Sequence, residues 1–399
     1  DEQGGFDCIL GNPPWERIKF DEKEFFEVAL PEVALIANKA TRLERISQLA
    51  TSNPALHAAY VSARHGSECA SKFAKTSGRS PLGSGGDTNL FAMFVELGDA
   101  YLSEFGNCGM LVPTDIVTAE SYLPLFQQLY SSARLKAALD FENKEKLFPI
   151  HSSERFCILV IGNALHSTEF AFYLTNPLQL SDPTRRVPIT RQDFALMRPI
   201  TPTCPVLRSR HDLLLARQLY GSHSVLGQSE SWNVRPTRIF DMAKPEVAGE
   251  AVEVRKLPEQ VRHQLSDTRM AADTIGWSLI YEGKMFEAFS HRAAGVIVVE
   301  ANVNRPAQSL EASDAQRSDP SWRPLSSYAI PVDEVHTRVS RLGLDGAVLA
   351  FKDVSGANNE RSLIAAVLPS ASANFSVRVV RPGSHCQAEM AVLAAILNS

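Results

Sequence analysis

The feature that most constrains this chain lies near its beginning, where a short apolar segment ends in a rigid turn. Residues 6–11 (Phe-Asp-Cys-Ile-Leu-Gly) predict a buried strand, and residues 12–15 (Asn-Pro-Pro-Trp) follow it directly. Each proline fixes its own φ angle, so the turn has few accessible conformations. In open α/β sheets, ligands bind at the carboxyl ends of strands. Residues 12–15 are therefore the first candidate for a functional loop.

Predicted strands and helices alternate over the first 165 residues. Residues 22–75 are rich in Glu, Lys, Ala and Leu and predict helices, with a break at Asn53-Pro54. The further predictions are a flexible loop at 77–88, a helix at 90–104 that Asn89 could cap, a strand at 108–113, a helix at 121–131, and strands at 135–141 and 155–162. This alternation indicates an α/β sheet covered on both faces, with the last two strands forming an antiparallel edge.

The sequence changes in character after about residue 165. Proline is frequent at 183–205, the predicted strands become short, and 301–331 predicts a long loop. We therefore predict two domains. The first is an α/β domain at 1–165 with a helical insertion at 22–88, and the second is an α+β region at 166–399.

Charge and cysteine content exclude some classes of protein. The net charge is −5, no apolar run is long enough to span a membrane, and the six cysteines lack the spacing of zinc ligands. We expect reduced thiols, no metal and a cytoplasmic location. Residues 184–262 carry 13 Lys and Arg against 8 Asp and Glu. Such an arginine-rich segment can contact phosphates, although an ordinary solvated surface has the same composition.

The loop at 12–15 suits one particular chemical problem. The exocyclic amine of a nucleobase is a poor nucleophile, because its lone pair is delocalised into the ring. The side-chain carbonyl of Asn12 and the backbone carbonyl of Pro13 could accept its two N–H groups and free that lone pair, and the adjacent Pro14 helps to preorganise them. Trp15 offers a face on which a base removed from its duplex could stack. The alternative is a rigid Pro-Pro turn with Trp15 packed in the core.

This Asn-Pro-Pro-Trp (NPPW) loop resembles the catalytic signature of the adenine-N6 DNA methyltransferases. The order of loop and downstream region is similar to the gamma class, above all to the large fused enzymes of type IIG restriction–modification and phage-defence systems. The stretches that carry this resemblance, in the same order as in that family, are residues 86–96, 109–114, 281–286 and 359–362. The resemblance implies a partial class I (Rossmann-like) methyltransferase sheet followed by a target-recognition region.

The resemblance also implies a cofactor and a partner, namely S-adenosylmethionine and double-stranded DNA. Asn12 and Pro13 would bind the target amine, Trp15 would stack on the adenine, and Asn12 and Pro113 would border the cofactor. Pro113 and Thr114 end the strand that closes the same pocket. The family's glycine-rich cofactor turn is not in this sequence. The resemblance therefore implies that the upstream part of the same polypeptide carries it, and that this segment by itself is inactive.

In the predicted recognition region, side chains with base- or phosphate-binding chemistry fall in three places. Asn and Arg read adenine and guanine in the major groove, although Asn is also common in ordinary turns. The candidate DNA-binding residues are Lys284, His291, Arg292, Asn358, Asn359 and Arg361.

The sequence is also compatible with two other functions. The segment could be a DNA-recognition module without activity, which cofactor binding by the isolated chain would test. It could also be a metal-dependent nuclease, in which Glu282 and Lys284 act with Asp273. A surface ion pair has the same Glu-x-Lys spacing. Metal-dependent cleavage that a Glu282→Ala substitution removes would identify the nuclease.

Overall fold

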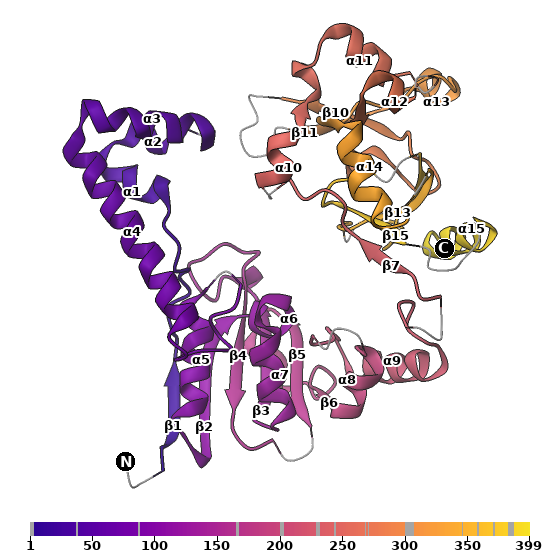
Figure 1. Ribbon diagram of the computed structural model, residues 1–399. Coiled ribbons are helices and arrows are strands. Elements are labelled where there is room, and N and C mark those ends of the chain that lie inside the picture. Colours follow the sequence, from indigo (N-terminus) through magenta and orange to yellow (C-terminus); the bar gives the residue numbers. More distant parts are fainter. Residues whose placement is uncertain are drawn as a thin grey trace. The chain divides into compact units, whose positions relative to one another are not determined.

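In a computed structural model, the protein divides into two compact units, Asp1–Val225 and Leu226–Ser399 (Figure 1). The structure describes residues 4–36, 39–86, 88–164, 167–199, 203–228, 232–242, 245–267, 269, 271–299, 307–344, 346–356, 359–369, 372–381 and 387–399.

A six-stranded mixed sheet forms the centre of the first unit, in the order β1-β2-β4-β3-β5-β6. The strands are β1 (Phe6–Gly11), β2 (Leu102–Pro113), β3 (Leu135–Glu142), β4 (Arg155–Ile161), β5 (Thr168–Leu174) and β6 (Val187–Ile189). β1 pairs with β2 in parallel, as β3 does with β5, whereas β4 runs antiparallel to both β2 and β3. The α/β fold class is as predicted.

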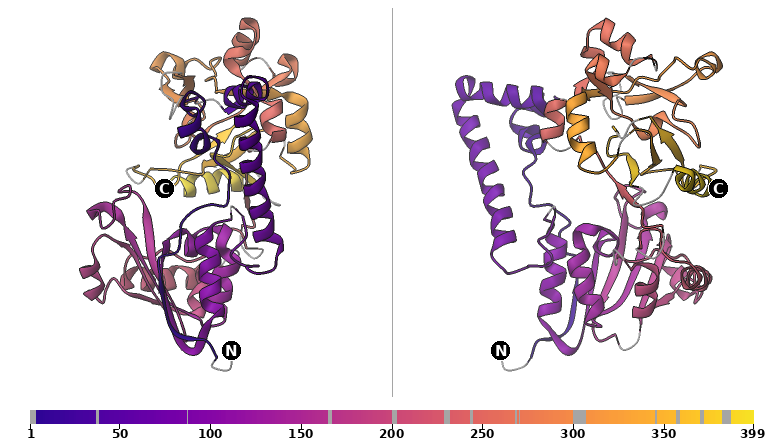
Figure 2. Two further views of the ribbon diagram at one scale, coloured as in Figure 1. Left: turned by 90° about the vertical axis from the view of Figure 1, so that its left-hand side faces the viewer. Right: turned by 45° about the vertical axis from the view of Figure 1, so that its right-hand side comes forward.

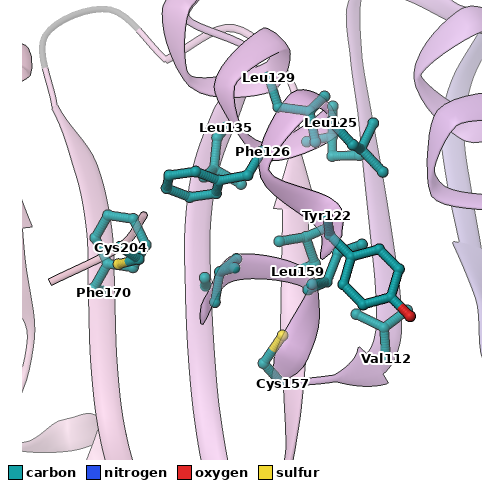
Figure 3. Close-up of a cluster of buried hydrophobic side chains, with 14 of the residues drawn as sticks. Val112, Tyr122, Leu125, Phe126, Leu129, Leu135, Cys157, Leu159, Phe170 and Cys204 are labelled. Carbon is teal, nitrogen blue, oxygen red and sulfur yellow. The ribbon is translucent and has the colours of Figure 1, made fainter. Parts of the chain in front are cut away.

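One face of this sheet is covered by helices α5 (Leu90–Ala100), α6 (Asp115–Thr118) and α7 (Leu123–Ser131). Phe126 from α7, Leu135 from β3 and Phe170 from β5 meet in the main core of the unit (Figure 3). Asn89 is the N-cap residue of α5, as predicted. Its side-chain amide, however, donates to the Tyr122 hydroxyl at 2.5 Å and makes no capping bond.

β1 differs from the prediction of a buried strand. Almost all of its residues are exposed, and Leu10 is 87% exposed. The physical reason is its position, because β1 is the first strand of the sheet and has β2 as its one neighbour among the described strands.

The predicted domain boundary at residue 165 falls inside this sheet. β5 and β6 follow that residue and pair with β3 and with each other, and Phe170 and Phe172 of β5 belong to the main core. The unit then continues through α8 (Arg191–Met197) and α9 (Arg210–Ser222) to Val225. For the same reason, β3 and β4 are antiparallel as predicted but lie inside the sheet and do not form its edge.

The predicted helical insertion is present, and it leaves the sheet after β1 and returns before α5 (Figure 2). Its helices are α1 (Glu22–Ala29), α2 (Pro31–Ala34), α3 (Lys39–Ser52) and α4 (Pro54–Thr76). Asn53 ends α3 and caps α4, because its side chain accepts the Leu56 N–H at 3.2 Å. The segment predicted as flexible is anchored at Gly83, whose N–H donates to the Glu96 carboxylate at 2.7 Å.

Among its described residues, the second unit has three small sheets, in the orders β14-β13-β15-β7, β8-β12-β9 and β10-β11, and all their pairings are antiparallel. The strands are β7 (Arg235–Thr237), β8 (Val252–Glu253), β9 (Trp277–Leu279), β10 (Ala294–Val298), β11 (Ala307–Glu311), β12 (Tyr328–Pro331), β13 (Val348–Lys352), β14 (Ala365–Leu368) and β15 (Val377–Arg381). The helices are α10 (Pro245–Glu250), α11 (Glu259–Leu265), α12 (Ala272–Ile275), α13 (Asp314–Ser318), α14 (Val332–Ser340) and α15 (Gln387–Leu397).

The predicted long loop at 301–331 is therefore wrong over most of its described length, because β11, α13 and β12 lie within it. β11 forms through pairing with β10, a contact that the local sequence does not reveal. Within the described ranges, no helix has both the length and the apolar character needed to cross a membrane.

Candidate functional site

The candidate site lies at the carboxyl edge of the six-stranded sheet, which is the side where most of its strands end. β1, β2, β3 and β5 all end at this edge, and β4 begins there, as the register of the strands requires. The sheet edge therefore brings together residues that are far apart in the sequence. They are the loop at 12–15, Thr114, the segment 140–143, Arg155 and Tyr173.

The Asn-Pro-Pro-Trp loop is hydrogen-bonded to the sheet at its Trp15 end and exposed to solvent at its Asn12 end. Asn12 and Pro14 are exposed, Pro13 is buried and Trp15 is half-buried. The pairing of β1 with β2 ends at Met110, so the next carbonyl of β2, that of Leu111, is free to accept the indole N–H of Trp15 at 3.2 Å. This bond fixes the indole, while the Asn12 side chain faces solvent.

An open cavity of about 340 Å³ adjoins this loop. Its lining consists of residues 12–15, Leu111 and residues 148–150 (Phe-Pro-Ile). The volume falls in the range of small-molecule pockets, about 300–1,000 Å³. Trp15, Phe148 and Asn12 are among the lining residues, so aromatic residues and a residue with a side-chain amide adjoin the same cavity. Trp15 also packs against two hydrophobic clusters of this unit.

Asn143 positions the cavity wall formed by residues 148–150. Its only signal in the sequence is its place just after a predicted strand. It is fully buried. Its side-chain NH2 donates to the carbonyls of Phe148 and Ile150, both at 2.9 Å, and its Oδ1 accepts the Phe148 N–H at 3.0 Å. These bonds hold residues 148–150 against the loop at 12–15.

Asp140 is a second residue that sequence reasoning missed. It is 1% exposed, and its carboxylate accepts from the Thr114 hydroxyl at 2.5 Å, from Arg155 at 2.5 Å and from the Tyr173 N–H at 2.8 Å. Thr114, at the end of the strand that was expected to close the pocket, donates its hydroxyl to Asp140. Pro113 is half-buried and is not among the residues that line the cavity.

Three of the predicted DNA-binding side chains make hydrogen bonds within the second unit. Lys284 donates to the Ala307 carbonyl at 2.8 Å, Arg292 donates to the carbonyls of Asp319 and Trp322 at 2.7 and 3.1 Å, and Arg361 donates to the Asn398 carbonyl at 2.7 Å. Each of these cations therefore satisfies backbone carbonyls of its own unit.

The remaining predicted DNA-binding residues of this unit are His291, Asn358 and Asn359. His291 is half-buried, and its burial together with the nearby Arg292 and Arg323 lowers the pKa of its imidazole. Asn359 is exposed. Asn358 lies outside the described residues.

The residues of the nuclease hypothesis have other partners. Glu282 is 7% exposed and its carboxylate accepts the Ser327 N–H at 2.9 Å, while Asp273 pairs with His336 at 2.7 Å. The Lys284 Nζ lies 3.8 Å from the Glu282 Oε2, so these two side chains form an ion pair. In the described part of the chain, no group of three His, Cys, Asp or Glu side chains could hold a metal ion. The geometry therefore gives the nuclease hypothesis no support.

No protein-family model and no curated protein matches this chain. Among solved structures, it is similar to DrdV in a complex with DNA, at 10% identity and a TM-score of 0.34, covering 94% of this chain and 36% of that one. It is also similar to the type IIL restriction–modification enzyme MmeI in complex with DNA, at 11% identity and a TM-score of 0.39, covering 98% of this chain and 42% of that one.

A third similar structure is a nuclease-deletion mutant of the type ISP restriction–modification enzyme LlaGI with a DNA substrate mimic. The identity is 10%, the TM-score is 0.35, and the match covers 94% of this chain and 35% of that one. The chain thus spans less than half the length of each of these three proteins.

Proposed function

We propose that this chain carries the amine-binding loop of an S-adenosylmethionine-dependent adenine-N6 DNA methyltransferase of a restriction–modification or phage-defence system. One observation carries the proposal. The Asn-Pro-Pro-Trp loop follows a strand at the carboxyl edge of an α/β sheet, and it lines an open cavity with the Asn12 side chain exposed.

Asn12 and Pro13 would act on the target amine. The Asn12 side-chain carbonyl and the Pro13 backbone carbonyl would accept its two N–H groups, which frees the nitrogen lone pair to attack a methyl group. The two prolines and the bond from Trp15 to Leu111 preorganise these acceptors, so little reorganisation is needed as charge develops. The surplus proton would leave to solvent, to which Asn12 is exposed.

Trp15 and Phe148 would hold the base once it has left the duplex. Both line the cavity, and Phe148 is 37% exposed. Stacking on an aromatic side chain stabilises a base by about 1–3 kcal/mol, which offsets part of the cost of unstacking it. The contacts from Asn143 keep Phe148 in place.

The cofactor would supply an electrophilic methyl group on a sulfonium, and breaking its S–CH3 bond would release a neutral thioether. The described residues do not fit the whole of this group, because no glycine-rich turn directly follows a strand among them. Residues 83–86 lie between two helices instead. Asn12, with the half-buried Pro113 further along the edge, would at most border the methyl donor.

The outer side of β1, which pairs with no described strand, indicates where the rest of the cofactor site would lie. Phe6 and Leu10 are 62% and 87% exposed, and the outer hydrogen-bonding groups of β1 have no partner strand in the described part of the chain. Exposed apolar edge strands are usually covered or paired in native proteins. We infer that an upstream part of the same polypeptide pairs here and completes the cofactor site.

The test is methyl transfer from labelled S-adenosylmethionine to adenine in duplex DNA by the full-length polypeptide. We expect Asn12→Ala to lower the rate by at least about 100-fold, as does removal of one preorganised transition-state contact, and to leave DNA binding intact. Glu16→Ala is the matched control, since Glu16 is exposed just beyond the loop. An Asn12→Ala protein with unchanged transfer would sink the assignment.

The missing glycine-rich turn favours a second possibility for the 399-residue chain taken alone. This segment would bind DNA without methylating it. Titration calorimetry of the isolated chain with S-adenosylmethionine separates the two cases. Binding would show that the segment holds a cofactor site of its own, whereas DNA binding without cofactor binding would identify a recognition module.

A further inference from the structure

Tyr173 lies at the same sheet edge as the candidate site, in an unusual environment. The guanidinium of Arg155 lies 4.4 Å from the centre of its ring and that of Arg208 lies 4.8 Å from it. Both distances are those of cation–π contacts. Arg155 begins β4, whereas Arg208 lies just before α9, so strand pairing and helix packing bring the two together around β5.

The backbone of Tyr173 is strained. Its φ angle is +57°, which bulky side chains rarely adopt and which costs about 1–3 kcal/mol. Contacts on both sides maintain this conformation. The Tyr173 N–H donates to Asp140 at 2.8 Å, and Arg185 donates to the carbonyls of Phe172 and Tyr173 at 3.2 and 2.9 Å. Strain that is maintained by several partners is characteristic of functional positions.

The tyrosine–arginine cluster, which comprises Tyr173, Arg155, Arg185 and Arg208, carries an excess of positive charge. Asp140 is the one carboxylate that forms an ion pair with any of these arginines in the described part of the chain. The Nε atoms of Arg155 and Arg185 are buried without an acceptor. Buried donors without partners are rare in native proteins, and each calls for an explanation.

These residues also account for part of the arginine-rich segment at 184–262. Other arginines of that segment have local partners, since Arg186 pairs with Glu169 at 2.6 Å and Arg210 donates to the Arg186 carbonyl at 2.9 Å. Arg185 and Arg208 instead converge on Tyr173. Arg208 is exposed, so its guanidinium is accessible to a ligand.

We propose that the tyrosine–arginine cluster binds a backbone phosphate of the nucleic acid whose base enters the Asn12 cavity. This inference rests on the proposed function. A guanidinium binds phosphate oxygens through paired N–H groups, and the guanidinium groups of Arg155 and Arg208 both contact the ring of Tyr173. Contacts to phosphates fix the register of a protein on DNA. A phosphate held here would keep the strand at the same sheet edge as the amine-binding loop.

The test measures binding of a fluorescent DNA duplex of mixed sequence to the full chain over a series of salt concentrations. For Arg208→Ala we expect weaker binding, with the slope of log affinity against log salt reduced by about 0.9, the value for one lost phosphate contact. Arg208→Lys should restore most of the slope, because it keeps the charge. Arg210→Ala is the control, since it removes the same charge two residues away.

Equal slopes for wild type, Arg208→Ala and Arg210→Ala would overturn the proposal, as would the absence of DNA binding by the wild-type chain at low salt. Equal losses in the two alanine variants would also overturn it, since they would indicate a general effect of charge. Thermal unfolding checks that each variant is folded. The proposed function fails separately, if the full-length polypeptide transfers no methyl group to DNA that it binds.

Discussion

Polar side chains behave differently in the two units of this protein. At the sheet edge of the first unit, Asn12 is exposed beside a cavity and Arg208 is exposed beside Tyr173. In the second unit, three side chains that were predicted to bind DNA donate to backbone carbonyls. They are Lys284, Arg292 and Arg361. Arg185 and Arg210 of the first unit also donate to backbone carbonyls, so the contrast lies in Asn12 and Arg208, whose exposed side chains are accessible to a ligand.

The difference follows from the surrounding backbone. The carbonyls of a wide sheet are satisfied by neighbouring strands, so side chains at its edge are available for other partners. The second unit has short strands and irregular connections, which leave many carbonyls without a strand partner. Buried backbone groups must find partners, and long cationic side chains provide them. A basic residue in an irregular segment is thus weak evidence for nucleic-acid binding.

The largest effect is expected for Asp140→Ala. The substitution leaves Arg155 partly buried without its carboxylate, and breaking such a pair lowers the free energy of unfolding by about 3–5 kcal/mol. Urea unfolding of the full chain measures this. Glu104→Ala, an exposed acidic residue on β2, should have almost no effect. A similar result for the two variants would mean that the contacts of Asp140 contribute little to the stability of the first unit.

A smaller loss is expected for Asn143→Ala, about 1–3 kcal/mol, because the side chain makes several buried hydrogen bonds to backbone groups. The substitution also releases Phe148 from the cavity wall. We therefore expect weaker binding of duplexes that contain an abasic or mismatched target, in which a base leaves the stack easily. Exposed Lys144→Ala is the control, and unchanged binding in both variants would argue against Phe148 as a contact.

Arg292→Ala tests the second unit directly. The side chain donates to three backbone carbonyls, so its removal should lower the free energy of unfolding by about 1–2 kcal/mol. DNA affinity at constant salt should change little. Arg317→Ala, an exposed arginine of α13, is the control. A marked fall in DNA affinity without loss of stability would mean that Arg292 contacts DNA. The two units would then not differ in this respect.

The smallest effect concerns pH and His291. Burial, with Arg292 and Arg323 nearby, lowers the pKa of His291 below its usual value of about 6.5. The unfolded chain therefore binds a proton at a higher pH than the folded chain does. The contribution of this group to stability is complete above pH 6.5 and decreases as the pH falls below it. His291→Gln should flatten the unfolding free energy between pH 7 and pH 5, and an unchanged slope would contradict this.

Local features were predictable from sequence because they depend on neighbouring residues. β1, the break at Asn53 and the loop at 12–15 were all placed correctly, since apolar runs, proline and helix caps act within a few residues. The exposure of β1 was not predictable in the same way. An apolar strand has the same sequence whether it lies at the centre of a sheet or at its edge.

The sequence by itself determined that a proline-stiffened Asn-Pro-Pro-Trp loop ends a strand of an α/β sheet. Tertiary structure alone decided which residues surround that loop. Strand order placed β4 between β2 and β3, carried the sheet past residue 165, and joined Asp140 to Arg155 and Tyr173. The physical reason is the range of the interactions. Strand pairing and buried charge pairs join residues that are tens of positions apart, and no local pattern records which partners they choose.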